Sequence, residues 1–100
     1  MKRASSLEEI RDILRKHRAE LKKDYRVRKL AVFGSYARGE ATSESDLDML
    51  VEFDEPPGFF RFLQLERHLS KLLGVPVELV TVEALKPHIG RHIMQEIVEV

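Results

Sequence analysis

The sequence predicts a mixed α/β (α+β) fold, in which helices pack against one small mixed β-sheet. Three short apolar runs rich in β-branched residues, at 27–33, 47–53 and 75–82, have the composition of strands. Two longer segments, 7–23 and 59–73, repeat their apolar residues at helical spacing. Helical and strand-like segments in this order are typical of a single sheet covered by helices.

The first helix is predicted to begin after Ser6. Ser6 and Glu9 form a capping-box pattern, in which the serine side chain accepts a hydrogen bond from a free backbone N–H group of the first turn. Apolar residues then recur on one helix face. The helix is expected to end near Lys23 or Asp24, and the first strand, 27–33, follows it.

The second long helix, 59–73, is predicted to follow the turn Pro56-Pro57-Gly58, which ends the second strand. Its periodicity places Phe59 toward the sheet and Phe60 outward. Gly74 is expected to stop this helix, because glycine readily adopts the left-handed conformation that ends helices.

The last part of the chain is predicted to contain a strand and a helix. The apolar run 75–82 is the third strand. Lys86-Pro87 then breaks the chain, and a helical pattern follows at Ile89, Ile93 and Ile97.

Size and composition limit the class of protein. One hundred residues suit one domain with a modest core, so a single domain is expected over residues 1–100. The formal net charge of zero argues against a protein that binds nucleic acid through a broadly basic surface. The basic residues near the first strand are interpreted as a solvated helix end and turn; they are Lys22, Lys23, Arg26, Arg28 and Lys29.

The sequence also bears on redox chemistry and location. It contains no cysteine, which excludes a disulfide framework or a thiolate site within it. It has no apolar run of transmembrane length and no apolar signal core. A cytoplasmic protein with no membrane contact is therefore expected.

Two polar motifs border the first two strands. Gly34-Ser35 follows the first strand, where a tight turn can offer backbone N–H groups and a hydroxyl to a phosphate. Ten residues separate this pair from Asp46-Leu47-Asp48, which stands at the start of the second strand. Side chains alternate along a strand, so the two aspartates share one face. The pattern predicts a site for a nucleoside triphosphate and carboxylate-bound Mg²⁺.

The segments Gly34-Ser35-Tyr36-Ala37-Arg38-Gly39-Glu40 and Ser45-Asp46-Leu47-Asp48 resemble the GSxARG…SDxD signature of the polymerase-β-type nucleotidyltransferases. The chain is particularly similar to the minimal nucleotidyltransferases (MNT), and the resemblance covers most of its length. It implies a polymerase-β-like nucleotidyltransferase core. It also implies a reaction in which AMP moves from ATP to a hydroxyl and pyrophosphate is released.

The carboxylates have expected roles at such a site. Asp46 and Asp48 are expected to be catalytic and to hold Mg²⁺, with two ions clamping the attacking and leaving oxygens. Glu78, in the third strand, matches by position a third family carboxylate that holds metal and takes the proton. That residue is usually aspartate, so Glu78 departs by one methylene. The alternative interpretation of Glu78 is an edge-strand carboxylate that points to water.

The triphosphate is expected to bind at the turn. Gly34 permits close approach of the backbone, and Ser35 can donate its hydroxyl to a phosphate. Arg38 has two interpretations. Its planar set of donors suits the triphosphate or the leaving pyrophosphate, and the same side chain could instead be a surface cation paired with Glu40.

The resemblance also implies a partner. MNT proteins are commonly paired with a HEPN-domain toxin ribonuclease, and the MNT antitoxin adenylylates a tyrosine of the toxin. This chain is accordingly expected to be the antitoxin of such a module. Three alternatives stay open: a non-catalytic nucleotide-binding antitoxin that acts by steric contact, an antibiotic-type small-molecule nucleotidyltransferase, and a transferase acting on nucleic-acid ends. The neutral charge disfavours the last.

Overall fold

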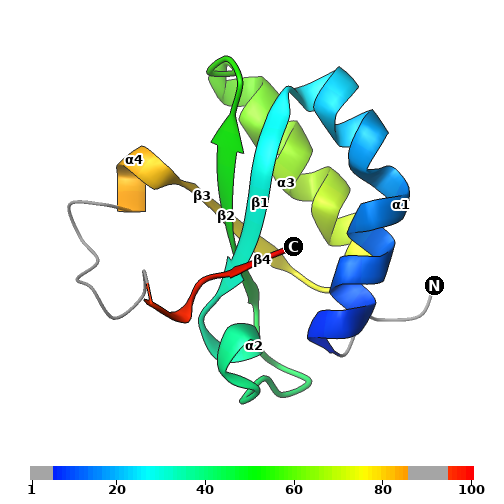
Figure 1. Ribbon diagram of the computed structural model, residues 1–100, viewed down its shortest axis with the longest axis vertical. Coiled ribbons are helices and arrows are strands. Elements are labelled where there is room, and N and C mark those ends of the chain that lie inside the picture. Colours follow the sequence, from blue (N-terminus) through cyan, green and yellow to red (C-terminus); the bar gives the residue numbers. More distant parts are fainter. Residues whose placement is uncertain (1–5, 86–94) are drawn as a thin grey trace.

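A computed structural model describes residues 6–85 and 95–100 of the chain (Figure 1). Its elements follow one another as α1 (Leu7–Tyr25), β1 (Val27–Phe33), α2 (Ser35–Arg38), β2 (Leu47–Phe53), α3 (Phe59–Leu73), β3 (Val77–Thr81), α4 (Val82–Leu85) and β4 (Val98–Glu99). The predicted mixed α/β class is confirmed.

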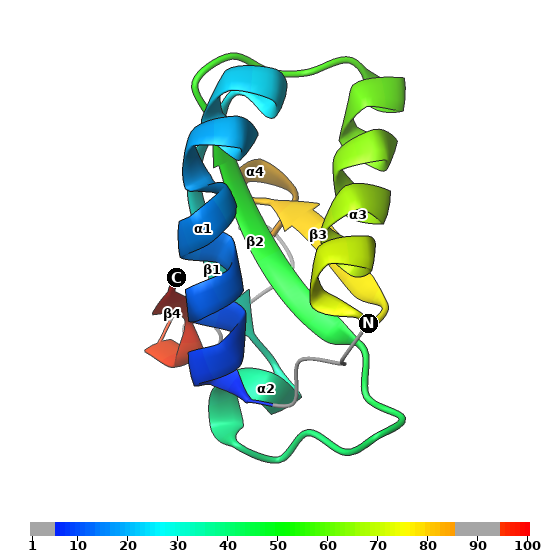
Figure 2. The ribbon, with the colours of Figure 1, turned by 90° about the vertical axis from the view of Figure 1, so that its right-hand side faces the viewer.

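The strands form one mixed sheet in the order β3-β2-β1-β4. β1 runs antiparallel to β2 and to β4, whereas β2 and β3 are parallel. The parallel pair is joined through α3, since a parallel connection must cross over the sheet. Helices α1 and α3 lie side by side on one face of the sheet (Figure 2). The main body therefore has two layers.

The main core lies between the sheet and these two helices. Its buried residues include Ile10, Leu14 and Leu21 of α1, Leu65, Leu69 and Leu73 of α3, and Val32, Met49, Val51 and Leu79 of the strands. A smaller apolar cluster on the opposite face of the sheet is formed by Ala31, Phe33 and Leu50. Removing this apolar surface from water is the main force that holds the layers together.

The predicted cap at the start of α1 and the predicted glycine stop at the end of α3 are both present. Ser6 Oγ accepts a hydrogen bond from the backbone N–H of Glu9 at 3.2 Å, which confirms the predicted cap. α1 continues to Tyr25, just past its predicted end, and stops where Arg26 adopts a left-handed conformation with φ 60°. α3 has its predicted bounds and ends at left-handed Gly74. Within residues 6–85 and 95–100, no helix has the length and apolar composition needed to cross a membrane.

The prediction for Phe59 was wrong. Phe59 is 71% exposed, although Phe60 is outward as predicted, at 79%. The residues of α3 that are fully buried are Leu65, Leu69 and Leu73. Phe62 is partly buried against the core, so the helix meets the core from this residue onward. Periodicity alone does not reveal where along a helix the contact begins.

The prediction for the end of the chain was also wrong in part. Ile89 and Ile93 lie outside the described residues. Gln95 and Glu96 are helical, but Ile97 is not, because it lies between them and β4, which pairs with Ala31 and Val32 of β1. This strand forms by pairing with a distant edge, so the local pattern of apolar residues could not predict it. The third strand is also shorter than predicted, since α4 begins at Val82.

The Leu69→Ala variant is expected to lose about 2–5 kcal/mol of unfolding free energy, because the leucine is fully buried between α3 and the sheet. Urea unfolding followed by circular dichroism measures the loss. Lys71→Ala, at an exposed position of the same helix, is the matched control and should change stability by less than about 0.5 kcal/mol. Equal losses in the two variants would contradict this description of the core.

Candidate active site

Three strands bring the predicted site residues to one end of the sheet. Phe33, the last residue of β1, pairs with Asp48 of β2, and Asp48 pairs with Glu78 of β3. Gly34 directly follows β1, and Asp46 directly precedes β2. The short helix α2 lies at this same end of the molecule (Figures 1 and 2). The glycine turn and the three carboxylates therefore belong to one site.

Gly34 lies against the carboxylate of Asp48. Its backbone has φ 73° and ψ −150°, a conformation that residues with a side chain rarely adopt. A Cβ atom at this position would overlap with Asp48 Oδ2. Only glycine therefore allows β1 to turn into α2 while the Asp48 carboxylate keeps its place.

The loop between α2 and β2 is folded on itself. Gly39 ends α2 in a left-handed conformation with φ 72°. The backbone N–H of Thr42 donates to Ser45 Oγ at 2.9 Å, and the N–H of Ser45 donates back to the Thr42 carbonyl at 3.1 Å. Asp46 directly follows this closed turn, so the loop determines the position of Asp46 at the start of β2.

Two side chains of α3 hold the strand that carries Glu78. The N–H of Val77 donates to Ser70 Oγ at 3.0 Å, and the N–H of Leu79 donates to a Glu66 carboxylate oxygen at 2.9 Å. These bonds lie on either side of Glu78 in sequence and fix the backbone from which it projects. Sequence reasoning missed both residues, because α3 carries other polar residues and nothing in the sequence distinguishes Glu66 and Ser70 from them.

The carboxylates at this end of the sheet act on one another. Partial burial raises the pKa of Asp48, and the neighbouring Glu78 and Asp46 carboxylates raise it further. The positive charge of Arg38 lowers the same pKa and so offsets part of the rise. Glu78 itself is exposed, as is Asp46. The three carboxylates thus carry more negative charge than the single positive charge of Arg38 can balance.

Arg38 is bound to two carboxylates. Its Nε donates to Glu40 and its Nη1 donates to Glu96, both at 3.2 Å. These carboxylates raise the pKa of Arg38 above its usual value. The surface pairing with Glu40 that was the alternative interpretation is therefore present. The positive charge of Arg38 also lowers the pKa of Asp48. Glu96 was missed, because nothing in the sequence links it to a residue so distant along the chain.

The donor set has the chemistry of a magnesium site. Within the described ranges, no three His, Cys, Asp or Glu side chains are arranged as a metal-binding group. Asp46, Asp48 and Glu78 nevertheless offer hard carboxylate oxygens, the ligands that Mg²⁺ prefers. A divalent cation among them would also offset the repulsion that raises the pKa of Asp48.

The chain is similar to known nucleotidyltransferases in sequence. Residues 14–100 match the family model of the nucleotidyltransferase domain. Protein adenylyltransferase MntA of Thermococcus cleftensis is 46% identical to the chain, over 95% of the chain and 96% of the relative. A protein of Methanocaldococcus jannaschii, provisionally named a protein adenylyltransferase, is 49% identical over 95% of the chain and 98% of its own length.

The fold is similar to solved structures of the same kind. A structure provisionally assigned as a minimal nucleotidyltransferase superposes with a TM-score of 0.77 at 34% identity, over 96% of this chain and 97% of that one. A structure of a tri-AMPylated HEPN toxin of Shewanella oneidensis in complex with an MNT antitoxin gives a TM-score of 0.62 at 17% identity, over 90% and 70% of the two chains. This second likeness shows the fold alone.

The Gly34→Ala variant is expected to lose about 3 kcal/mol or more of unfolding free energy, because strain at positive φ adds to the overlap with Asp48. Thermal and urea unfolding measure the loss. Gly39→Ala is the matched control: its φ is nearly the same, but no atom lies within 4 Å of the added Cβ, so about 1–2 kcal/mol is expected.

A second variant isolates the contact from the backbone strain. Replacing Asp48 by alanine in the Gly34→Ala background removes the overlapping carboxylate and should recover part of the lost stability. If the two glycine variants lose the same amount, or if the double variant recovers nothing, the close approach of Gly34 to Asp48 is not present in solution.

The Asp48→Asn variant is expected to be more stable than the parent chain at neutral pH in EDTA and to have a higher Tm. A raised pKa in the fold means that ionised Asp48 costs stability at any pH above that pKa. The gain should disappear at acidic pH, where the carboxyl is protonated in both states. Asp12→Asn, at an exposed position of α1, is the control and should leave Tm unchanged. A fall in Tm for Asp48→Asn at neutral pH would contradict the prediction.

Proposed function

The chain belongs to the nucleotidyltransferase domain family and is a nucleotidyltransferase, and from this premise we propose that it transfers AMP from ATP to a hydroxyl of a partner protein. The observation that carries the proposal is the contact of the Gly34 turn with Asp48, beside Asp46 and Glu78. Phosphates bound at this turn would lie directly against a group of carboxylates, which supports the proposal. Because ATP is the substrate, we place the protein in the cytoplasm.

The turn after β1 is the proposed triphosphate site. Gly34 lets the backbone approach the phosphates closely, and the half-buried Ser35 supplies a hydroxyl at the start of α2. Arg38 is the proposed cation for the triphosphate and the leaving pyrophosphate. Its bonds to Glu40 and Glu96 hold the guanidinium near the site, and the phosphates would compete with those carboxylates for it.

Asp46 and Asp48 are the proposed ligands of Mg²⁺, with Glu78 as ligand of a second ion. Bound Mg²⁺ would neutralise phosphate oxygens and make the hydroxyl more acidic. The acceptor oxygen forms a bond to the α-phosphorus, and the bond from that phosphorus to the oxygen bridging to the β-phosphate breaks. Glu78 takes the hydroxyl proton, and pyrophosphate leaves with the displaced electron pair. Every atom of ATP is thereby divided between the adenylylated acceptor and pyrophosphate.

The proposed acceptor is a tyrosine of a HEPN-domain toxin. The similar protein of Thermococcus cleftensis is named a protein adenylyltransferase, which supports a protein acceptor. The Shewanella structure pairs an MNT antitoxin with a tri-AMPylated HEPN toxin on a similar fold. Adenylylation of its toxin would make this chain the antitoxin of the pair.

A second candidate function has one observation in its favour. Glu78 lies exposed on β3, which is an edge strand of the sheet, and it is a glutamate where family members usually have aspartate. If its longer side chain does not reach the reacting hydroxyl, the chain would bind nucleotide and inhibit its toxin by contact alone. Whether AMP reaches the toxin separates the two functions.

Incubation of the chain with ATP, Mg²⁺ and the HEPN-domain protein encoded beside it should add one or more AMP units to that protein, measured by intact mass. Label at the α-phosphate of ATP should appear on the toxin, whereas label at the γ-phosphate should not. Asp46→Asn and Asp48→Asn should slow transfer by about 10²–10³-fold, since each removes charge that stabilises the transition state. EDTA should abolish transfer.

Complex formation is the control in this experiment. Gel filtration should show that Asp46→Asn still binds the toxin, and Asp12→Asn should transfer AMP at the parent rate. A stable complex that never gains AMP would support inhibition by contact and would refute the enzymatic proposal. Peptide mapping identifies the modified residue, and a site other than tyrosine would refute that part alone.

A further inference from the structure

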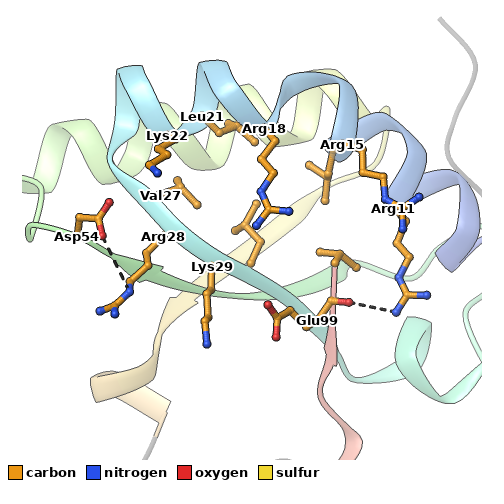
Figure 3. Close-up of a pocket in the computed structure, with 13 residues that line it drawn as sticks. Arg11, Arg15, Arg18, Leu21, Lys22, Val27, Arg28, Lys29, Asp54 and Glu99 are labelled. Carbon is orange, nitrogen blue, oxygen red and sulfur yellow. Dashed lines mark hydrogen bonds and ion pairs between the residues drawn. The ribbon is translucent and has the colours of Figure 1, made fainter.

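A basic groove lies between α1 and the edge of β1, a cavity of about 630 Å³ (Figure 3). We define it by its six cations: Arg11, Arg15, Arg18 and Lys22 of α1, and Arg28 and Lys29 of β1. Three of these, from Lys22 to Lys29, were interpreted from sequence as a solvated helix end. The fold instead brings them together with arginines from earlier in the helix.

The positive charge of the basic groove is largely unbalanced. Asp54 and Glu99 are the acidic residues that line it. Arg28 Nε lies 4.0 Å from Asp54 Oδ1, and Arg11 Nη2 donates at 3.1 Å to the backbone carbonyl of Glu99, which carries no charge. Arg15, Arg18, Lys22 and Lys29 make no ion pair with any described residue. The groove therefore suits an anionic occupant.

The cations of α1 form a line rather than a cluster. They recur three or four residues apart, which places them on one face of the helix. At 1.5 Å per residue, the line from Arg11 to Lys22 is about 16 Å long. An extended peptide rises about 3.3 Å per residue, so about five residues would match this length. In Figure 3 the Arg18 side chain points from α1 toward β1, across the groove.

Along one wall of the basic groove, β1 has no strand partner among the described residues. β4 pairs with Ala31 and Val32 of β1, and the N–H of Val100 donates to the Leu30 carbonyl at 3.0 Å. No described strand continues this pairing along the stretch Val27–Lys29, which borders the groove. An unpaired edge can accept a further strand through backbone hydrogen bonds. A peptide has the backbone groups for this and a nucleic acid does not, so the edge favours a peptide.

We propose that the basic groove binds an extended acidic segment of a partner protein. The segment adds to the edge of β1 before Leu30, and its carboxylates pair with the arginines of α1. Alternate side chains of such a strand point to the same side, so acidic residues at every second position would all face the helix. Binding at this surface needs no nucleotide transfer and is separate from the candidate active site.

The probe for this proposal is a fluorescein-labelled peptide of alternating Glu and Val residues, whose binding is followed by fluorescence anisotropy without nucleotide. The peptide is expected to bind, and more weakly as salt rises. Arg15→Glu with Arg18→Glu should weaken binding at least about tenfold, because repulsion replaces two ion pairs. Arg67→Glu with Lys71→Glu makes the same charge change on exposed positions of α3 and should weaken it less than about twofold.

Two further comparisons separate the contribution of charge from that of backbone pairing. Arg15→Gln with Arg18→Gln removes charge without reversing it and should give an intermediate loss, even if the glutamate variant fails to fold. Two further peptides are prepared, each N-methylated at one of the two alternating sets of amides. One of them should bind at least about tenfold more weakly, because its methyl groups replace the N–H donors that would face β1. An affinity for the peptide that is the same in the α1 variants as in the parent chain would overturn the proposal. Tighter binding of a short oligouridylate than of the peptide would overturn it in favour of nucleic acid.

Discussion

The register in which β1, β2 and β3 pair is the constraint on which the candidate site depends. It sets Phe33, Asp48 and Glu78 side by side across three strands. A slip of one residue would send Asp48 to the other face of the sheet, because side chains alternate along a strand. Gly34 then completes the arrangement, since its missing side chain leaves space for the Asp48 carboxylate. The site is thus a property of strand pairing more than of any single motif.

Sequence reasoning worked where structure is set by neighbours in the chain. The turn residues Pro56-Pro57-Gly58 before α3 and Gly74 after it made the bounds of that helix predictable. β1 and β2 also have their predicted bounds, because each is a mostly apolar run that is followed by turn residues. β4 and the bond from Arg38 to Glu96 escaped prediction for the opposite reason. They join segments far apart in sequence, and the spacing of apolar residues within a segment does not predict such a contact.

A zero net charge proved to be a poor guide to the surface of this protein. Net charge is summed over the sequence without regard to position, whereas the fold brings acidic residues together in one place and basic residues together in another. Asp46, Asp48 and Glu78 gather at one end of the sheet, and the six cations of the basic groove gather between α1 and β1. The sum of charges therefore says nothing about one face, and a partner approaching the basic groove meets a local positive field.

The bonds from Ser70 and Glu66 to β3 have a consequence for how copies of this protein can associate. They occupy the N–H groups of Val77 and Leu79 along the outer edge of the sheet. Fibril growth through sheets requires two free edges per molecule, so that each copy joins one neighbour on either side. Because the N–H groups of Val77 and Leu79 are already bonded to α3, they are not available to a strand of another copy. A copy that approached the β3 edge would have to break these two bonds before it could pair there, which disfavours growth of a sheet across that edge.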